Sequence, residues 1–304
     1  MTTAMALLAL AGTAQAAASP SVLTGGARSV SYSSAILTGT INPKASATSY
    51  YFQYGPTRAY GGQTAIASAG AGSSEVHAAL QVGGLQPLTV YHYRIVAVNG
   101  AGSSDGADHT FQTTKVPLSL AILAAPNPVP YGGNIVVQGT LSGTFNQSQP
   151  VVLQADTFPY TAGFLDYGNT ELTSTAGSFS FPVLSLGAAT QFRVVTQTNP
   201  PVISPVALAG VSARVSAHVG RDGRRGYIRI YGTVTPVETG MKIAILRISH
   251  GHGVLVGGTA LSRHSTASSS FSRAIRARRG LYRVLVQVTT GAQLSSYSTP
   301  LLVG

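Results

Sequence analysis

The sequence predicts an all-β chain made of consecutive β-sandwiches, because two short stretches recur three times and keep their separation, the signature of a tandem array. One stretch places a glycine inside a strand, and the other places an arginine between an aromatic and two aliphatic residues. The paired markers are Gly39 and Arg94, Gly139 and Arg193, and Gly232 and Arg283, which are 55, 54 and 51 residues apart. This spacing predicts three units of similar build.

Length and composition agree with three units. Beyond the first 18 residues, about 286 remain, or about 95 for each unit, the size of a seven-stranded sandwich. The chain contains neither Cys nor Trp, so disulfides and thiolate metal sites are excluded and each unit depends on its apolar core. We expect domains at 19–115, 116–207 and 208–304, joined by short proline-containing segments that favour an extended rod.

The amino terminus has the pattern of a secretory signal peptide. Residues 4–11 form a short apolar run, and Ala14-Gln15-Ala16 is a cleavage-type triplet. No basic residue precedes the run, which is atypical of such peptides. No apolar stretch is long enough to span a membrane as a helix. We therefore expect residues 1–18 to be a signal peptide and the protein to lie outside the cell or at its surface.

The most informative run of the first unit is residues 85–99. A leucine, a proline turn and a tyrosine that opens a strand indicate a tyrosine corner. The alternation of the strand predicts core-facing and outward-facing sets. The core-facing set is Tyr91, Tyr93, Ile95 and Ala97, and the outward set is His92, Arg94 and Val96.

These motifs resemble the fibronectin type III domain of bacterial proteins. The resemblance covers about residues 30–114. It rests on four motifs: L-x-P-x-T-x-Y-x-Y-R, A-V-N-x-A-G, a closing T-F-x-T and the strand Y-F-x-Y-G. It implies a β-sandwich. The early tryptophan of many family members is missing, and the chain has no Arg-Gly-Asp triplet, so integrin-type binding is not implied.

The second and third units resemble each other and the immunoglobulin-like sandwiches found beside such domains in secreted bacterial proteins. Phe179 and Phe271 are 92 residues apart, close to the 93 residues between Gly139 and Gly232. We expect strands at 134–141 and 150–155 in the second unit and at 227–234, 242–248 and 282–288 in the third. We further expect the strand of residues 177–181 to pair with the strand that holds Phe192 and Arg193.

The net positive charge belongs entirely to the third unit. Residues 1–210 hold six basic and six acidic residues, whereas residues 211–304 hold thirteen basic residues against Asp222 and Glu238, which accounts for the whole net charge of +11. In the strand 227–231, Tyr227, Arg229 and Tyr231 are expected to share one face, opposite Ile228 and Ile230.

Arginine forks match phosphate and carboxylate groups, so the charged unit predicts contact with a polyanion. The partner would be an anionic cell-wall polymer, an acidic polysaccharide or nucleic acid held without specific recognition. The alternative is charge that only keeps the unit soluble. The predicted contact residues are Arg221, Arg224, Arg225, Arg229, Arg273, Arg276, Arg278 and Arg279.

An aromatic loop at 158–167 offers a second hypothesis. Exposed rings could stack on sugars, whereas buried rings would pack at a domain joint or in the core. The ring-bearing residues are Phe158, Tyr160, Phe164 and Tyr167.

Catalytic and metal sites are weakly indicated. The acids Asp156, Asp166 and Glu171 flank this loop, but a flexible loop seldom holds two carboxylates at hydrolase spacing. His250, His252 and His264 lack a nearby acid that would orient a metal ligand. No nucleophile motif or phosphate-binding loop occurs, so we expect no catalytic residues, no metal and no cofactor.

Together these patterns predict a secreted, non-enzymatic surface or matrix protein with a structural or adhesive role, in contact with a wall polymer and with other surface proteins. One alternative is a carbohydrate-binding accessory protein that uses the aromatic loop. Another is a filament subunit assembled through sheet edges, which open sandwiches expose.

Overall fold

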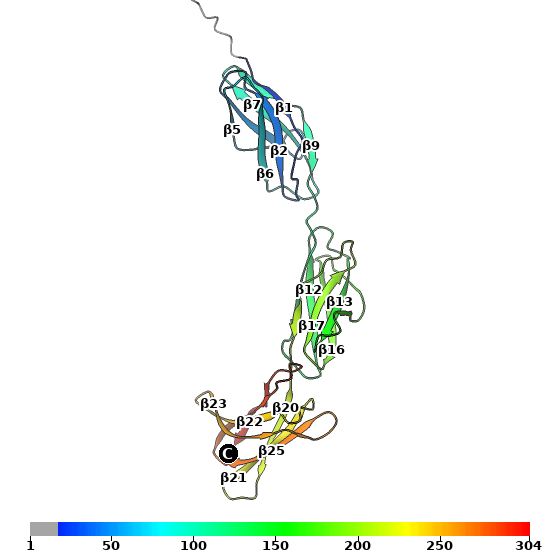
Figure 1. The fold of residues 1–304 in the computed structure, drawn as a ribbon, viewed down its shortest axis with the longest axis vertical. Coiled ribbons are helices and arrows are strands. Elements are labelled where there is room, and N and C mark those ends of the chain that lie inside the picture. Colours follow the sequence, from blue (N-terminus) through cyan, green and yellow to red (C-terminus); the bar gives the residue numbers. More distant parts are fainter. Residues whose placement is uncertain (1–17) are drawn as a thin grey trace, which may run out of the picture. The chain divides into compact units, whose positions relative to one another are not determined.

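The structure, a computed structural model, describes residues 18–304, and the prediction of an all-β chain is confirmed in this range: 57% of the described residues are in strands and none is in a helix (Figure 1). Consequently, no helix among these residues is long and apolar enough to cross a membrane. The predicted signal peptide lies, but for residue 18, outside the described residues. The chain divides into two compact units, one up to Val116 and one from Pro117 onward, and each is described by itself.

The first unit is a sandwich of two antiparallel sheets around one core. Its smaller sheet has the order β1 (Ser21–Thr24), β2 (Ser34–Asn42), β6 (Val76–Gly83). The larger sheet centres on β3 (Thr48–Gly55) and β7 (Val90–Asn99). Its flanking strands are β4 (Gly62–Gln63), β5 (Ala67–Gly70), β8 (Gly102–Asp105) and β9 (His109–Gln112).

Strand β7 carries the predicted tyrosine corner. The Gln86 backbone N–H donates to the Tyr91 hydroxyl at 3.0 Å, and the four predicted core residues of the strand are all buried. Val96, which was predicted to point outward, is nevertheless only 4% exposed. Val96 lies between Tyr51 of β3 and Asp105 of β8, and a central strand is covered by such neighbours even on its outer face.

The compact unit from Pro117 onward contains two sandwiches, called here the second and the third. The smaller sheet of the second sandwich has the order β10 (Ser119–Ala125), β12 (Gly133–Ser142), β16 (Ser178–Leu186). The other sheet centres on β13 (Pro150–Thr157) and β17 (Thr190–Thr196). Its flanking strands are β14 (Leu165–Asp166), β15 (Glu171–Leu172) and β18 (Ala207–Ala209). Phe179, Phe181 and Phe192 meet in its core.

One predicted pairing in this sandwich is wrong. The strand at 177–181 belongs to β16, which pairs with β12, whereas the strand of Phe192 and Arg193 is β17, which pairs with β13 in the opposite sheet. The short link 187–189 carries the chain from one sheet to the other. Neighbours in sequence do not always pair, and here the two strands meet through the core instead.

The third sandwich follows in the same unit. Its arginine-bearing sheet has the order β20 (Arg214–Arg221), β21 (Tyr227–Thr235), β25 (Ser269–Arg276), β24 (Ser262–Arg263). The opposite sheet has the order β23 (His252–Ala260), β22 (Lys242–Ser249), β26 (Gly280–Gln287), β27 (Ser296–Tyr297), and β28 (Leu301–Val303) also pairs with β26. The core includes Ile230, Phe271 and Tyr282.

Hydrogen bonds join the second and third sandwiches. The chain passes between them through β19 (Val211–Ser212), which pairs in parallel with β11 (Val129–Pro130). The Ala189 N–H donates to the Ala292 carbonyl at 2.7 Å, and the Gln293 side chain donates to the Gly187 carbonyl at 2.9 Å. Val211 packs in the core of the second sandwich and Ala213 in the core of the third. The domain boundaries given in the sequence analysis remain predictions.

Candidate functional site

The third sandwich exposes positive charge without exposing a side-chain carboxylate. Of its thirteen basic residues, only Arg247 and Arg283 are partly buried, and the others are exposed. Its two acids are both covered: the Asp222 side chain is 1% exposed and Glu238 is 5% exposed. Burial raises the pKa of Glu238. The surface charge of residues 211–304 is therefore more one-sided than the composition indicates.

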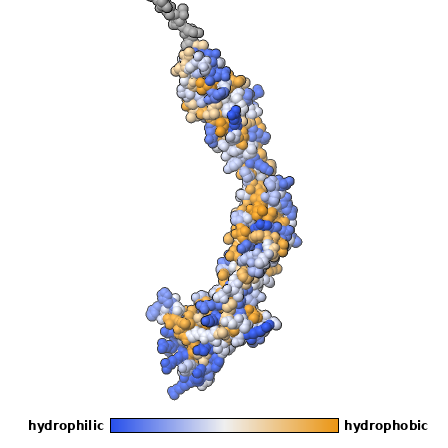
Figure 2. Space-filling model, in the orientation of Figure 1, coloured by the Kyte–Doolittle hydropathy of each residue, from blue (hydrophilic) through white to orange (hydrophobic). Residues whose placement is uncertain are grey.

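Six of the eight predicted contact arginines gather at one end of the arginine-bearing sheet. Strand pairing places the β20–β21 turn beside the end of β25, and the Ala277 N–H donates to the Gly226 carbonyl at 2.8 Å. We call this region the arginine end; Figure 2 shows hydrophilic residues gathered on the same sandwich. Its members are Arg221, Arg224, Arg225, Arg276, Arg278 and Arg279.

The remaining two arginines lie on opposite faces of the sheet. Tyr227, Arg229 and Tyr231 are exposed on the outer face while Ile230 is buried, which confirms the predicted alternation of β21. Arg273 pairs with Ile230, so its side chain starts from the inner face, although the residue itself is exposed. The eight arginines therefore do not share one face, because strand alternation separates Arg273 from Arg229.

Asp222 organises the arginine end. Its carboxylate accepts the Arg224 Nε–H at 2.6 Å and an Arg229 Nη2–H at 2.7 Å. The hydrogen bond from Arg224 holds the pKa of Asp222 below its ordinary value, helped by the charges of both arginines and opposed by burial. The Arg224 guanidinium also lies 4.7 Å from the centre of the Tyr227 ring. Two of the arginines are thus held in place before any ligand arrives.

A hollow of about 660 Å³ lies on the outer face of the same sheet, next to the arginine end. We call it the Tyr231 hollow. Cross-strand rows form its floor: His218, Tyr231 and Ser272 form one row, and Ser216, Thr233 and Ser270 form the next. Arg229, Ser262 and His264 line its sides. The arrangement offers one half-exposed aromatic ring, one guanidinium, two imidazoles and several hydroxyls.

Contacts within the Tyr231 hollow fix its polar groups. The His218 and Tyr231 ring centres are 5.7 Å apart, and His218 Nε2 lies 3.3 Å from the Ser216 hydroxyl. An Arg229 Nη1–H donates to the Ser272 hydroxyl at 3.1 Å. Tyr231 and Arg229 were predicted on this face from alternation, whereas His218 was not predicted and His264 was considered only as a metal ligand, because only the strand register brings the four residues together.

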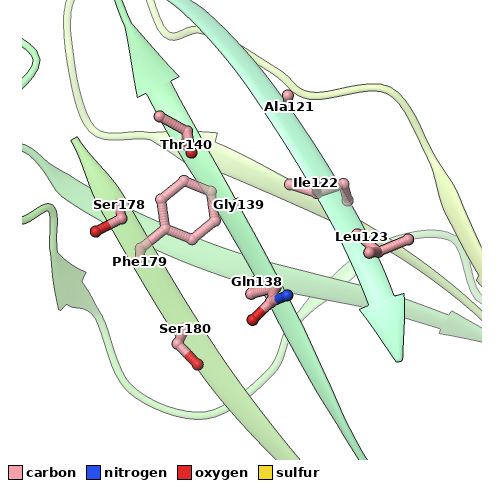
Figure 3. A pocket seen from close by; sticks show the side chains of 9 residues that line it. All are labelled: Ala121, Ile122, Leu123, Gln138, Gly139, Thr140, Ser178, Phe179 and Ser180. Atoms are coloured by element: carbon pink, nitrogen blue, oxygen red, sulfur yellow. The ribbon is translucent and has the colours of Figure 1, made fainter. Parts of the chain in front are cut away.

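The second sandwich has a corresponding hollow of about 680 Å³ (Figure 3). Its rows are Leu123, Gln138 and Ser180, and Ala121, Thr140 and Ser178. Counted from Gly139 and Gly232, Leu123 occupies the position of His218, Gln138 that of Tyr231, and Val136 that of Arg229. The two sandwiches thus share these cross-strand rows with different chemistry, and only the Tyr231 hollow is also lined by Thr259, Ala260, Ser262 and His264.

The repeated glycines explain why this geometry recurs. Figure 3 shows the Phe179 ring beside Gly139, and a side chain at Gly139 would come within 2.6 Å of that ring. A side chain at Gly232 would meet Phe271 at 2.9 Å and the Ser216 carbonyl at 1.9 Å. In these two sandwiches a phenylalanine ring fills the space that the glycine leaves, and Ile95 lies beside Gly39 in the first, so the recurring marker is a packing device.

The aromatic loop does not form one open platform, because each ring has a protein partner. Phe158 packs edge-on against Tyr160 and lies against Gly291 of the third sandwich. Phe164 is covered by the Arg193 guanidinium at 4.3 Å, and Tyr167 meets Phe192 edge-on. The contact between Phe158 and Gly291 favours the joint hypothesis over sugar stacking.

The predicted acids and histidines do not converge. Asp156 is buried and its Oδ1 atom has no hydrogen-bond partner, whereas Asp166 accepts a hydrogen bond from Gln154 at 2.9 Å. His250 lies in the β22–β23 turn with a φ of 51°, away from the hollow that His264 lines. Within residues 18–304, no three His, Cys, Asp or Glu residues are grouped so that they could hold a metal ion.

The first sandwich contains a polar cluster that the sequence analysis missed. Asp108 accepts hydrogen bonds from Tyr60 at 3.0 Å and Arg58 at 3.2 Å, and lies 2.8 Å from His92 Nδ1. Burial alone would raise the pKa of Asp108, but hydrogen bonds from His92 and Tyr60, with the charges of His92 and Arg58, hold it below its ordinary value. In the first sandwich, as at Asp222 of the third, the acid is paired with an arginine.

Comparisons with known proteins give structural neighbours only. No protein-family model matches the chain, and no curated protein matches its sequence. Similar solved structures include titin domains A168–A170 (14% identity, TM-score 0.36, covering 93% of this chain and 98% of that one) and chicken CNTN1 domains FN1–FN3 (14%, 0.31, 91% and 95%). A tetra-tandem repeat from the extending region of a large adhesion protein is another (14%, 0.33, 94% and 74%). Such low TM-scores carry no argument, so the fold assignment rests on the sheets described above.

Proposed function

We propose that this chain is a non-enzymatic structural protein of the cell surface or extracellular matrix, whose third sandwich attaches it to an anionic polymer. One observation carries the proposal: the third sandwich exposes eleven basic side chains, and its two side-chain carboxylates are both covered. A polymer that approaches this surface meets no exposed acidic side chain of the same sandwich.

The arginine end suits a repeating anion better than a single small ion. Guanidinium groups form forked hydrogen bonds with carboxylate or phosphate, and six of them lie around two adjoining loops. Asp222 holds Arg224 before binding, which reduces the entropy that a ligand must remove. Because exposed charges are screened beyond about 8 Å at physiological salt, the contact must be direct.

Residues 19–210 would act as a neutral spacer with contact surfaces of its own. Their basic and acidic residues balance, and several are already paired, including Arg94 with Asp105 at 2.7 Å. The location outside the cell rests on the predicted signal peptide. Secretion of the full chain, and its loss when residues 1–18 are deleted, would test that location separately.

A second candidate, assembly through a sheet edge, is favoured by β23. This edge strand has nine residues and exposes Val254, Leu255 and Val256, whereas β14 and β15 of the second sandwich have only two residues each. Long apolar edges tend to pair with other strands. Sedimentation that depends on concentration, and that Leu255→Lys abolishes, would support assembly; a monomer at all concentrations would discard it.

The test of attachment is binding of the full chain to an immobilised polyanion across a salt series. Binding should weaken about tenfold or more between low and high salt, because the Debye length falls to about 3 Å at 1 M. Replacing Arg221, Arg225 and Arg278 by Ala should weaken it at low salt. Binding that is indifferent to salt, or to these replacements, would contradict the proposal.

A further inference from the structure

We propose that the Tyr231 hollow binds one carboxylated sugar unit, so that the polymer held by the third sandwich is an acidic polysaccharide built from hexuronate residues. This inference rests on the proposed function and narrows it. It concerns a defined place on the outer face of the sheet, next to the arginine end but distinct from it.

The aromatic part of the hollow suits a sugar ring. Tyr231 is 43% exposed, and His218 packs against it at 5.7 Å, so the two rings form a short aromatic surface. An aromatic ring offers an apolar face for the C–H groups of a pyranose. Tyr227, on the same strand and face, is 39% exposed but lies under Arg224, and it does not line the hollow.

Arg229 supplies the charge that a carboxylate needs. Its side chain is 45% exposed, and it donates one hydrogen bond to Asp222 and one to Ser272. A guanidinium has five N–H donors, so further donors are available for a ligand. Asp222 and Ser272 fix the position of the group, and no acidic residue lines the hollow.

The remaining lining residues favour a sugar over a phosphate chain. Ser216, Thr233, Ser262 and Ser270 present hydroxyls, each able to donate and accept, as a sugar's own hydroxyls require. A phosphate chain would be held better by a cluster of cations, which the arginine end offers and the hollow does not. One arginine beside several hydroxyls and one aromatic ring therefore matches a singly charged sugar.

The second sandwich provides an internal comparison. Its hollow has nearly the same volume and the same rows, but Leu123, Gln138 and Val136 stand where the third sandwich has His218, Tyr231 and Arg229. Since the scaffold is shared, the three side chains carry the proposed specificity. The residues of the second sandwich also supply test variants that a sheet of this kind already accommodates.

The experiment measures binding of a galacturonic acid oligomer to the full chain, beside the same oligomer with its carboxyls reduced, dextran sulfate and polyphosphate. We expect the galacturonate oligomer to bind, the reduced oligomer to bind about tenfold more weakly, and Tyr231→Gln and Arg229→Val each to weaken binding about tenfold. Arg214→Ala, which removes a matched charge outside the hollow, should change it less than about twofold.

Two further measurements show whether each variant is folded and where on the chain the oligomer binds. Thermal unfolding shows whether a variant is still folded, and the ring resonances of His218 and His264 should shift during titration while those of His77 and His109 in the first sandwich stay in place. Equal binding of every polyanion, with Arg214→Ala as harmful as Arg229→Val, would overturn this inference and leave the proposed function standing. Equal binding of the reduced oligomer would overturn it too. Binding of no polyanion would overturn both.

Discussion

The outer faces of two corresponding sheets, β10-β12-β16 in the second sandwich and β20-β21-β25 in the third, share their cross-strand rows and differ in chemistry. Both place a glycine at the centre of the middle strand, cover it with a phenylalanine from the next strand and form a hollow of nearly equal volume. The first presents Leu123, Val136 and Gln138, and the second His218, Arg229 and Tyr231. The comparison teaches that the two sheets differ in their outward-facing residues, which the core does not constrain.

The largest expected effect tests the shared scaffold. Gly232→Ala would place a methyl group 1.9 Å from the Ser216 carbonyl, and Gly139→Ala would place one 2.2 Å from the Ala121 carbonyl. Each should lower the free energy of unfolding of its sandwich by about 3 kcal/mol, because the strands must separate. Gly39→Ala, with 2.8 Å to the Leu23 carbonyl, should cost less.

Chemical denaturation of each variant measures these losses. Gly83→Ala is the control, since nothing lies within 4 Å of the added methyl group. If the control is as damaging as Gly232→Ala, or if the order of the three glycines is reversed, the two faces do not share a glycine-centred scaffold.

The next largest effect is expected from the buried acid of the third sandwich, Glu238. Burial raises the pKa of Glu238, so the folded state holds the proton more tightly than the unfolded state. Stability is therefore greatest below the ordinary carboxyl pKa and decreases as pH rises toward the raised value. Glu238→Gln should stabilise the protein at pH 7, on the order of 1 kcal/mol, and the gain should vanish near pH 4.

Melting temperatures of the Glu238→Gln variant and of the natural chain, measured at pH 4 and at pH 7, test this expectation. A gain that is equal at pH 4 and pH 7 would mean that the amide packs better and that ionisation is not the cause.

A smaller effect is expected at Asp222, which ties the arginine end to the hollow. The pKa of Asp222 is held down, so its ion pairs persist above the ordinary carboxyl pKa and are lost as pH falls through the lowered value. Asp222→Asn adds one net positive charge but frees Arg224 and Arg229. Binding of polyphosphate should rise about twofold, and the preference for the galacturonate oligomer should fall by a similar factor. An unchanged preference would show that Asp222 does not position Arg229.

Local patterns in the sequence predicted much of the fold. Alternation placed Tyr91 and Tyr93 in the core and put Tyr227, Arg229 and Tyr231 on one outer face, because side-chain direction in a strand follows from position alone. The pairing of residues 177–181 was predicted wrongly, because register and sheet assignment depend on the opposite sheet, which no local pattern records.

The candidate site was predicted only in part for the same reason. The sequence named the arginines but did not predict which of them lie together, and His218 reaches Tyr231 only through the pairing of β20 with β21. Arg224 and Arg229 cover Asp222 because of the geometry of the turn. The composition alone does not distinguish Asp222 from an exposed acid.

Exchanging the two faces tests the central claim most directly. In the full chain, His218→Leu, Arg229→Val and Tyr231→Gln together remove the third-sandwich face, and Leu123→His, Val136→Arg and Gln138→Tyr introduce it on the second. We predict that the first set abolishes binding of the galacturonate oligomer and that adding the second set restores it. Unchanged binding after the first set, with the chain still folded, would contradict the account.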